Sequence, residues 1–358
     1  MSQIDLDSIN DIKKLDVSDV YGSVMALPDQ CLNAWTEANK VAVLDEYKRV
    51  NKLVMTGMGG SGLAARLIES LYWNQLKVPM MQVHDYNLPG FVDENTLVVC
   101  CSYSGSTEET IENFHQAAKT KSKIMVVSTG GKLIELAKEY KIPYYQIQAK
   151  YNPSNQPRMA VGYTLVGQIA LVQKCGLIDL AKTEIESAIK IMSEIKDKCK
   201  LERRLKENQA KQLARQMYGK IIGFVAAEHL AGALHTVKNQ TNENAKLFST
   251  RFDIPELNHH AMEGLKHPIQ NSNDLFFFMV QSKLYLDRNQ KRILITKDVI
   301  EKNHVSTYLY ETTSDRKVSQ CFEVIQLGSF VVFYLSMLYG INPAPIPWVD
   351  YFKEQLKK

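Results

Sequence analysis

Short apolar runs alternate with amphipathic helical segments in the first half of this 358-residue chain. The helical segments, at 63–72, 108–119 and 132–140, place their apolar residues on one face of a helix. Alternation of such helices with short, continuously apolar strands predicts a parallel sheet with helices over both faces. The predicted strands of this half span 52–56, 77–84, 97–101, 123–128 and 142–147.

The same alternation returns nearer the C-terminus, after a long helical stretch. Residues 161–175 and 180–217 are predicted to be helical, and the charged run 196–211 is expected to form a solvated helix face. A strongly apolar helix is expected at 324–339, followed by a short terminal helix at 348–356. Candidate strands of this half are 220–226, 247–252, 275–280, 292–296 and 306–311.

The chain is therefore predicted to have four parts. Residues 1–45 look helical, with a break at Leu27-Pro28, and lead into a first sheet domain at 46–155. A helical connector at 156–217 precedes a second sheet domain at 218–358, which ends in the terminal helix. The two halves share an architecture without visible sequence identity, which indicates a duplicated fold.

The loop Ser102–Thr107, SYSGST, joins the third predicted strand to a helix that begins at Glu108. Free backbone N–H groups, short hydroxyls and the positive end of a helix dipole are what a phosphate ester needs. A simpler interpretation makes Thr107 a helix N-cap, but it accounts only for Thr107 and Glu108. The other loop residues, Ser104 among them, favour a phosphate-binding loop.

A glycine-rich turn, GMGGSG at 57–62, follows the first predicted strand and fits the G-x-G-x-x-G pattern of dinucleotide-binding proteins. Asp85 ends the next strand, where an acid that binds ribose would stand. However, the turn also carries Ser61, and the small-residue loop 128–131 follows the fourth strand. Consecutive strand ends rich in Ser, Thr and Gly favour a pocket for one small phosphorylated ligand over an NAD site.

The composition is that of an ordinary globular protein, with 45% hydrophobic and 23% charged residues. A net charge of +4 is too small to indicate nucleic-acid binding. The acidic, polar N-terminus does not resemble a signal peptide, and no apolar run is expected to approach the length and hydropathy of a membrane span. Six cysteines without CxxC or framework spacing indicate free thiols and a reducing compartment, which predicts a cytoplasmic protein.

Six motifs together resemble the bifunctional phosphoglucose/phosphomannose isomerase branch of the phosphoglucose isomerase superfamily. They are TGMGGSG (56–62), SYSGSTEET (102–110), STGGKLIELA (128–137), QPRMAVGY (156–163), NENAK (242–246) and PELNHH (255–260). The resemblance extends from about residue 19 to the terminal lysines. It implies an α/β fold of two sugar isomerase (SIS) subdomains, each a doubly wound, flavodoxin-like parallel sheet with helices on both faces.

The resemblance also implies the chemistry. An aldose–ketose isomerase of this family would interconvert fructose 6-phosphate with glucose 6-phosphate, and with mannose 6-phosphate, by moving a proton through an enediolate. It would need neither a metal nor a nucleotide cofactor, and it would serve glycolysis and gluconeogenesis. The resemblance implies that His259 reaches the site from a neighbouring subunit, so a homodimer is expected here, without nucleic-acid or membrane partners.

Four residues match the family's catalytic positions. Glu243 is the expected base, because a carboxylate can accept and return one proton. His259 would open the sugar ring from the neighbouring subunit, and imidazole suits proton exchange at neutral pH. Arg158 would hold the region of the C1 oxygen, where a fixed guanidinium can stabilise an enediolate. Lys353, close to the C-terminus, would assist ring opening.

A second group of residues is expected to bind the substrate. The 6-phosphate would lie against hydroxyls of the serine loop, and the glycine turn would contact the edge of the sugar or phosphate. The serine loop contributes Ser102, Ser104 and Thr107, and the glycine turn contributes Gly59, Gly60 and Ser61.

Some features leave alternatives open. His260 and His267 lie close to His259, but adjacent histidines cannot easily ligate one ion and no acidic or cysteine cluster accompanies them. Asn342 and Ala344 depart from the family pattern near C1 and C2, which leaves the balance of glucose and mannose epimers undecided. Family members often carry Asn at the position that Ser occupies here, 106.

Two other functions stay open on the sequence alone. SIS domains also act as non-catalytic sugar-phosphate sensors in regulators, although residues 1–45 lack a basic patch and a clear helix-turn-helix. An isomerase of an amino-sugar or pentose phosphate is the other alternative. Glu243, His259 and Arg158 together favour catalysis over sensing.

Overall fold

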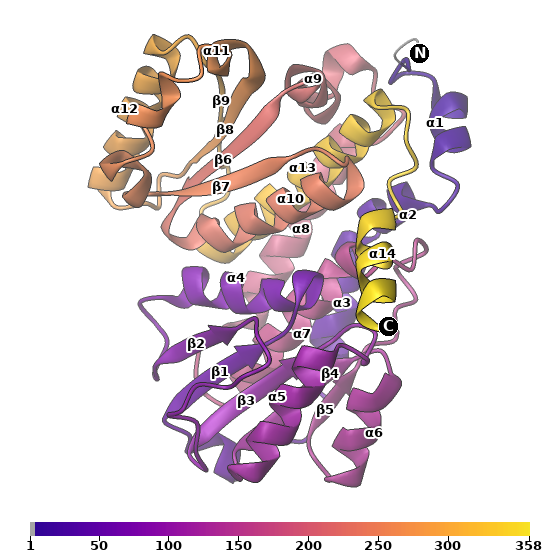
Figure 1. The fold of residues 1–358 in the computed structure, drawn as a ribbon, viewed down its shortest axis with the longest axis vertical. Helices are drawn as coiled ribbons and strands as arrows, with labels where there is room; N and C mark the ends of the chain where they lie inside the picture. The colour runs from indigo at the N-terminus through magenta and orange to yellow at the C-terminus, as the bar shows by residue number, and fades with distance from the viewer. Residues whose placement is uncertain (1–3) are drawn as a thin grey trace.

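The computed structural model describes residues 4–358 as two α/β domains, one above the other in Figure 1, with helices packed between their sheets. The lower sheet has five strands in the order β2-β1-β3-β4-β5, and every pair of neighbours is parallel. This is the flavodoxin-like order of a doubly wound fold. Its strands are β1 (Lys52–Thr56), β2 (Met80–Val83), β3 (Thr96–Cys101), β4 (Lys123–Ser128) and β5 (Tyr144–Gln146).

Alternate residues of the central strands face opposite layers of helices. Val98 belongs to one apolar cluster with residues of α5 (Glu108–Lys119) and α6 (Gly131–Glu139). Its neighbour Val99 belongs to the other cluster, with α4 (Leu63–Tyr72) and α7 (Val161–Lys174). The sheet is therefore buried on both faces, which explains why its strands are continuous apolar runs. The doubly wound fold predicted from the sequence is confirmed.

The upper sheet is also parallel throughout and has the order β7-β6-β8-β9, which repeats the first four positions of the lower sheet. Its strands are β6 (Ile221–Ala227), β7 (Ser249–Ile254), β8 (Leu275–Gln281) and β9 (Ser306–Glu311). The predicted strand at 292–296 is wrong, because these residues lie within α12 (Asp287–Lys302). That helix buries Ile293, Thr296 and Ile300, which have helical spacing.

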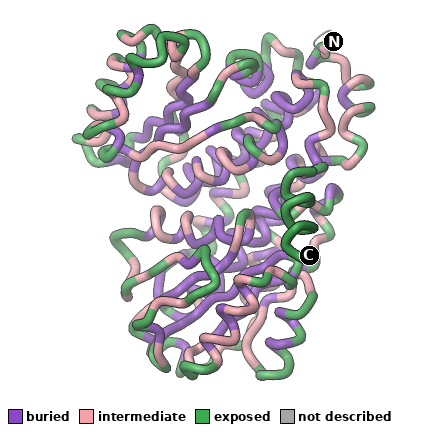
Figure 2. The backbone as a smooth tube through the Cα atoms, in the orientation of Figure 1, coloured by how far each residue is buried: buried purple, intermediate pink, exposed green. Residues whose placement is uncertain are grey.

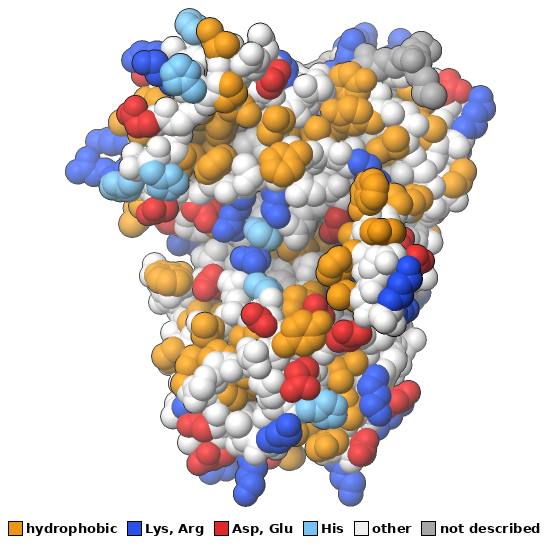
Figure 3. Space-filling view, viewed as in Figure 1, with side chains coloured by type: hydrophobic (Ala, Val, Ile, Leu, Met, Phe, Trp, Pro, Cys, Tyr) orange, Lys and Arg blue, Asp and Glu red, His pale blue; other side chains and the backbone are white. Residues whose placement is uncertain are grey.

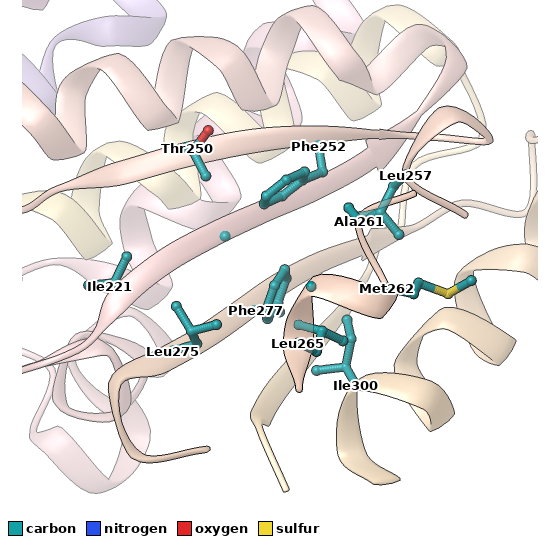
Figure 4. A pocket seen from close by; sticks show the side chains of 12 residues that line it. Ile221, Thr250, Phe252, Leu257, Ala261, Met262, Leu265, Leu275, Phe277 and Ile300 are labelled. Carbon is teal, nitrogen blue, oxygen red and sulfur yellow. The ribbon is translucent and has the colours of Figure 1, made fainter. Parts of the chain in front are cut away.

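The two faces of this sheet are covered differently. Helices α10 (Ala231–Asn244) and α13 (Lys317–Leu338) lie toward the first domain, and the opposite face bears α12, α11 (Asn271–Asp274) and the segment 255–270. An apolar cavity of about 260 Å³ remains under that segment, between Phe252, Phe277 and Leu265 (Figure 4).

Helix α13 is long and apolar enough to cross a membrane by length and composition, contrary to the sequence expectation, but its apolar window is entirely buried. It packs against α8 (Lys182–Cys199), α9 (Gln209–Met217) and α10 as the central helix of the protein core. The single helix predicted over 180–217 is therefore wrong. The chain breaks between α8 and α9, with a short 3₁₀ turn, η4 (Leu205–Glu207).

The charged run 196–211 is not the solvated helix face that the sequence predicts, since its last residue is fully buried. Lys211 donates hydrogen bonds to the carbonyl oxygens of Leu201 and Arg203 and to a carboxylate oxygen of Asp7. The backbone of the break therefore folds around one buried ammonium group, which a continuous helix could not do. Pairing of this kind is what permits a lysine to be buried.

The first and the last helix lie on the same side of the molecule (Figure 1). The N-terminal helices are α1 (Ile9–Leu15), α2 (Val20–Met25) and α3 (Leu27–Ala38). The terminal helix α14 (Pro347–Leu356) spans the junction of the two domains and has no buried residue, so it is exposed along its length in Figure 2.

All six cysteines are buried free thiols, as predicted for the two in β3. The remaining 3₁₀ turns are η1 (Asp45–Lys48), η2 (Gly59–Gly62), η3 (Pro157–Met159), η5 (Glu228–Leu230), η6 (Glu256–His259) and η7 (Glu263–Leu265).

Candidate active site

The glycine turn and the serine loop leave neighbouring strands at one edge of the first sheet. Strand β1 runs into η2, and β3 runs into the loop 102–107. Because β1 pairs with β2 on one side and β3 on the other, the strand order reverses between these two loops. Ligands of doubly wound sheets bind at this reversal, outside the carboxyl ends of the strands.

Ser61 joins the two loops. Its hydroxyl oxygen accepts a hydrogen bond from the backbone N–H of Tyr103 at 3.0 Å, and its side chain is buried. Gly60 lies against Pro157 and Arg158, where a Cβ would contact the backbone of Arg158 at 3.5 Å. The glycine turn therefore brings the sequence-distant QPR motif to the same edge of the sheet.

The serine loop separates into internal and exposed hydroxyls. Ser102 is buried, and its hydroxyl contacts that of Thr107 at 2.8 Å and accepts the N–H of Gly105 at 3.1 Å. Thr107 occupies the N-cap position of α5 without capping a backbone N–H, so capping does not explain its hydroxyl. Ser104 and Ser106 are exposed and contact each other at 3.0 Å. The exposed pair is thus the part of the loop that a ligand can reach.

Close packing fixes the conformation of the serine loop. Gly105 has φ of +71°, and a Cβ at this position would clash with the carbonyl oxygen of Gly130. The oxygen of Gly105 accepts the N–H of Leu133, and Tyr103 binds Thr129 through its carbonyl. The loop 128–131 therefore supports the serine loop from behind, and glycine is required at the contact.

Arg158 is buried in the interface between the two domains. Its Nη1 donates to the side chain of Gln156 at 2.9 Å, and its Nη2 donates to the carbonyl oxygens of Pro343 and Ala344. Its Nε donates to the side-chain oxygen of Asn244. Every nitrogen of the guanidinium is therefore held in place, and the side chain is only 2% exposed.

Glu243 faces this fixed cation from the last turn of α10. Its Oε2 lies 3.9 Å from Nη1 of Arg158, and its side chain keeps 29% of its surface exposed. Burial raises the pKa of Glu243, while the charges of Arg158, Lys246, Lys238 and Lys353 act in the opposite direction. A half-buried carboxylate with a raised pKa is suited to accept and release a proton.

Lys246 is a site residue that the sequence analysis missed. Its ammonium group donates to the carbonyl oxygens of Glu243 and Pro343, at 2.5 and 3.1 Å, and thereby joins the end of α10 to the segment before α14. Loss of solvation and the nearby Arg158 lower the pKa of Lys246 to about 8. The sequence could have indicated this residue, because Lys246 is the last residue of the NENAK motif.

The C-terminal helix lies over the same site. The positive charge of Lys353 is close enough to lower the pKa of Glu243, and the negative charge of Asp350 acts to raise the pKa of Arg158. Both side chains are exposed. The segment before the helix is fixed by its own contacts, since Asn342 accepts the N–H of Ala344 at 3.0 Å and Arg158 holds the carbonyl of Ala344.

His259 does not join these residues within one chain. It lies in η6, after β7, and is exposed, as is the adjacent His260, whose Nε2 lies 3.6 Å from Glu256. Within residues 4–358, no hydrogen bond or ion pair joins His259 to Arg158 or Glu243. The same described part of the chain contains no group of three His, Cys, Asp or Glu side chains placed to hold a metal ion.

Comparison with known proteins shows the family to which the chain belongs. Residues 206–356 match the bacterial phospho-glucose isomerase C-terminal SIS domain. The bifunctional phosphoglucose/phosphomannose isomerase of Caldicellulosiruptor bescii is 30% identical over 342 residues, which are 94% of this chain and 98% of that protein. The chain belongs to the bifunctional phosphoglucose/phosphomannose isomerase family. Its resemblance to this family, inferred from the motifs, is confirmed.

Other relatives of this isomerase agree. The protein of the same name from Aquifex aeolicus is 30% identical and covers 88% of this chain and 92% of its own length. A solved structure of a hypothetical protein from Thermus thermophilus matches 93% of this chain and 89% of its own at a TM-score of 0.74, with 14% identity, which supports the fold alone. Membership makes the chain an aldose–ketose isomerase, an intramolecular oxidoreductase.

Proposed function

We propose that this isomerase interconverts fructose 6-phosphate with glucose 6-phosphate and mannose 6-phosphate, with Glu243 as the base and Arg158 as the fixed cation. The observation that carries the proposal is the 3.9 Å approach of the Glu243 carboxylate to a guanidinium held at every nitrogen, beside two hydroxyl-rich loops. The names of the relatives describe phosphoglucose and phosphomannose as substrates, which agrees with this chemistry.

The reaction moves one proton between neighbouring carbons. Glu243 takes the proton from C2 of the open aldose, the electron pair moves to form the C1–C2 double bond, and the C1 carbonyl oxygen gains negative charge. Return of the proton to C1, with transfer of a hydroxyl proton from the O2 to the O1 side, gives the ketose. Arg158 is proposed to stabilise the enediolate oxygens, because its position is fixed before the charge develops.

The phosphate group is proposed to lie on the serine loop. Ser104 and Ser106 present exposed hydroxyls, and the partly buried Thr107 lies beside them at the N-terminus of α5. The amides of Gly59 and Gly60 lie across the strand reversal. Ser61 and Ser102 are buried, so their part is to hold the two loops together as much as to contact the ligand. Because the phosphate does not react, its binding energy positions the sugar.

Ring opening is proposed to use Lys353 together with His259 from a second subunit. The exposure of His259, and the absence within residues 4–358 of a hydrogen bond or ion pair between it and Glu243, support a role across an interface. Helix α14 supports dimerisation, because Trp348, Tyr351 and Phe352 are 82%, 56% and 61% exposed beside the site. An apolar patch of this kind is typical of a protein–protein interface.

The pocket near C1 and C2 is proposed to admit both epimers. Asn342 bonds to the backbone of its own segment, and Ala344 is buried beside Arg158, so neither residue extends a large side chain toward the site. We also place the enzyme in the cytoplasm, in glycolysis and gluconeogenesis, in keeping with its buried free thiols.

The test is turnover of fructose 6-phosphate by the wild-type protein and by Glu243→Gln, with glucose 6-phosphate and mannose 6-phosphate measured separately. Loss of a general base lowers the rate by about 10²–10⁴-fold. The matched control is Glu194→Gln, an exposed change on α8 that should leave turnover intact. A folded wild-type protein that binds the sugar phosphate without turnover would instead favour a sensor, and an active Glu243→Gln would reject this base.

A further inference from the structure

The two ends of a sugar phosphate would meet different parts of the site. The phosphate is placed on the serine loop, and the C1–C2 end is placed between Arg158 and Glu243. Figure 3 shows Lys, Arg and His side chains gathered where the two domains meet. Proton transfer requires a fixed separation between the two ends, because a displacement of about 1 Å can lower a rate about 100-fold. A rigid connection between the serine loop and the guanidinium would keep that separation.

Asn152 is the centre of such a connection. It is buried, and its side-chain nitrogen donates to the hydroxyl oxygen of Tyr103 at 3.1 Å and to the carbonyl oxygen of Gln156 at 3.0 Å. Its side-chain oxygen accepts the hydroxyls of Ser23 and Ser154, at 2.9 and 3.0 Å. These four hydrogen bonds use the full capacity of an amide side chain. The amide is therefore held from four directions.

Tyr103 is the end of this connection in the serine loop. It is the second residue of SYSGST and is buried. Its backbone N–H donates to the hydroxyl of Ser61 at 3.0 Å, and its carbonyl oxygen accepts the N–H of Thr129 at 3.0 Å. Its side chain is fixed separately, by Asn152. Because the exposed Ser104 follows directly in the chain, the position of Tyr103 determines where the loop presents its hydroxyls.

Gln156 is the end of the connection at the guanidinium. Its carbonyl oxygen accepts the side chain of Asn152, and its own side-chain oxygen accepts Nη1 of Arg158 at 2.9 Å. Nη1 is also the nitrogen that lies 3.9 Å from Glu243. Among residues 4–358, Gln156 is the only hydrogen-bond acceptor of Nη1. The direction of the nitrogen that faces the proposed base therefore depends on Gln156.

We propose that Asn152 and Gln156 are positioning residues that couple the phosphate-binding loop to Arg158. The inference rests on the proposed function, because it takes Arg158 as the cation beside the enediolate. The phosphate does not react, so its binding energy can serve the C1–C2 end only if the two ends are rigidly connected. Fully satisfied hydrogen-bond networks of low solvent exposure supply such rigidity. The connection runs from Tyr103 through Asn152 and Gln156 to Arg158.

The first test cuts the connection at each end and measures turnover of fructose 6-phosphate. Tyr103→Phe and Gln156→Met should each lower kcat by about 10-fold or more. KM should change less, because the exposed hydroxyls of Ser104 and Ser106 remain. The double variant should lose no more than the worse single variant, since either cut already releases the guanidinium from the loop. Losses that multiply in the double variant, or wild-type kcat in either single variant, would overturn the proposal.

The matched control is Tyr47→Phe, which removes another buried phenol hydroxyl. Tyr47 is 5% exposed, against 7% for Tyr103, and its hydroxyl donates to the carbonyl oxygen of Ile124 at 3.2 Å. The two Tyr→Phe variants should lower the urea midpoint to a similar extent, and only Tyr103→Phe should lower kcat. An equal loss of kcat in both would attribute the effect to general destabilisation and overturn the proposal.

A third variant, Gln156→Glu, keeps an acceptor for Nη1 of Arg158 but adds a negative charge. At alkaline pH its kcat should recover above that of Gln156→Met. The added charge should also raise the pKa of Glu243, so the acid limb of kcat/KM should move to higher pH. A limb that does not move, or a kcat as low as that of Gln156→Met, would show that Gln156 does not orient the cation.

Turnover by Glu243→Gln and Arg158→Lys tests the proposed function separately. If both keep wild-type kcat, the proposed function fails and this inference fails with it. If both lose activity while Tyr103→Phe and Gln156→Met keep wild-type kcat, only the coupling between the serine loop and Arg158 is rejected. Loss of kcat in all four proteins, with Tyr47→Phe active, is the result that the proposal requires.

Discussion

The guanidinium of Arg158 and the carboxylate of Glu243 approach to 3.9 Å across the junction of the two domains, although each belongs to a different half of the chain. Arg158 is immobilised by Gln156, Asn244 and the carbonyls before α14, whereas Glu243 keeps part of its surface exposed. The cation is therefore preorganised, and the carboxylate remains free to receive a proton. This asymmetry leads to the first prediction.

Arg158→Lys should impair catalysis although it keeps the charge. A lysine ammonium cannot reproduce the three fixed directions of a guanidinium, so the cation would no longer be held beside Glu243. Loss of one preorganised donor lowers kcat by about 100-fold or more. Steady-state kinetics with fructose 6-phosphate test this, with Arg215→Lys as the exposed control. Wild-type kcat in a folded Arg158→Lys protein would contradict the proposed role.

Lys238→Met should move the acid limb of the rate profile to higher pH. The positive charge of Lys238 favours ionised Glu243 and so lowers its pKa. Removing this charge raises the pKa further, so at acidic pH a smaller fraction of the enzyme carries the ionised base. The measurement is kcat/KM against pH for both proteins, with the exposed Lys198→Met as control. A limb that stays at the wild-type position would show that Glu243 does not titrate in catalysis.

Gly105→Ala should disrupt the serine loop. Its φ of +71° and the clash of a Cβ with the oxygen of Gly130 leave no room for alanine. The expected cost is about 2 kcal/mol or more in the free energy of unfolding, with a raised KM for sugar phosphates. Gly90→Ala is the control, because a Cβ there contacts nothing within 4 Å. Equal urea midpoints for the two variants would refute this account of the loop.

Much of the fold could be predicted because its signals are local. The bounds of β1, β4 and α5 match the sequence prediction to the residue, since each element is framed by its own turn or loop. The strand prediction at 292–296 was wrong because it rested on a run of apolar residues and did not consider the helical spacing of the buried ones. Leu294 and Ile295 are 49% and 61% exposed, while Ile293 and Ile300 face the core of the domain.

The sequence predicted the residues of the candidate site that lie in recognisable motifs, but not the contacts that hold those residues in place. Glu243 and Arg158 lie in recognisable segments, but the contacts that fix them come from elsewhere in the fold. Arg158 and Lys246 both donate to the carbonyl oxygen of Pro343. This contact cannot be predicted from the pattern of side chains, because every residue has a backbone carbonyl. Burial of Lys211 was missed for the same reason, since two of its three acceptors are backbone oxygens.

Lys211→Met should destabilise the protein without touching the active site. Lys211 is fully buried and paired with Asp7, and its loss leaves the carbonyls of Leu201 and Arg203 without a donor. Breaking a buried pair costs about 3–5 kcal/mol, and the lower end is expected because Asp7 is still 36% exposed. Urea unfolding measures the loss. Lys206→Met, on an exposed neighbour, should change stability by less than about 0.5 kcal/mol.

The last prediction concerns His259, which should act only across the subunit interface. Glu243→Gln and His259→Asn should each be inactive alone. In a mixed dimer, the subunit with intact Glu243 receives intact His259 from its partner, so one of the two sites is complete. Random pairing should therefore restore about a quarter of the wild-type activity. Co-expression with two different affinity tags isolates the mixed dimer for direct assay.

The reciprocal pairing distinguishes action across the interface from action within one chain. A double variant, Glu243→Gln with His259→Asn, is paired with a wild-type chain. If His259 acts on the partner's site, the wild-type Glu243 faces the substituted side chain of the double variant, and the mixed dimer is inactive. If His259 acts within its own chain, this dimer keeps one working site, and the first pairing has none. The two pairings thus give opposite results under the two arrangements, and activity in the second would reject a shared active site.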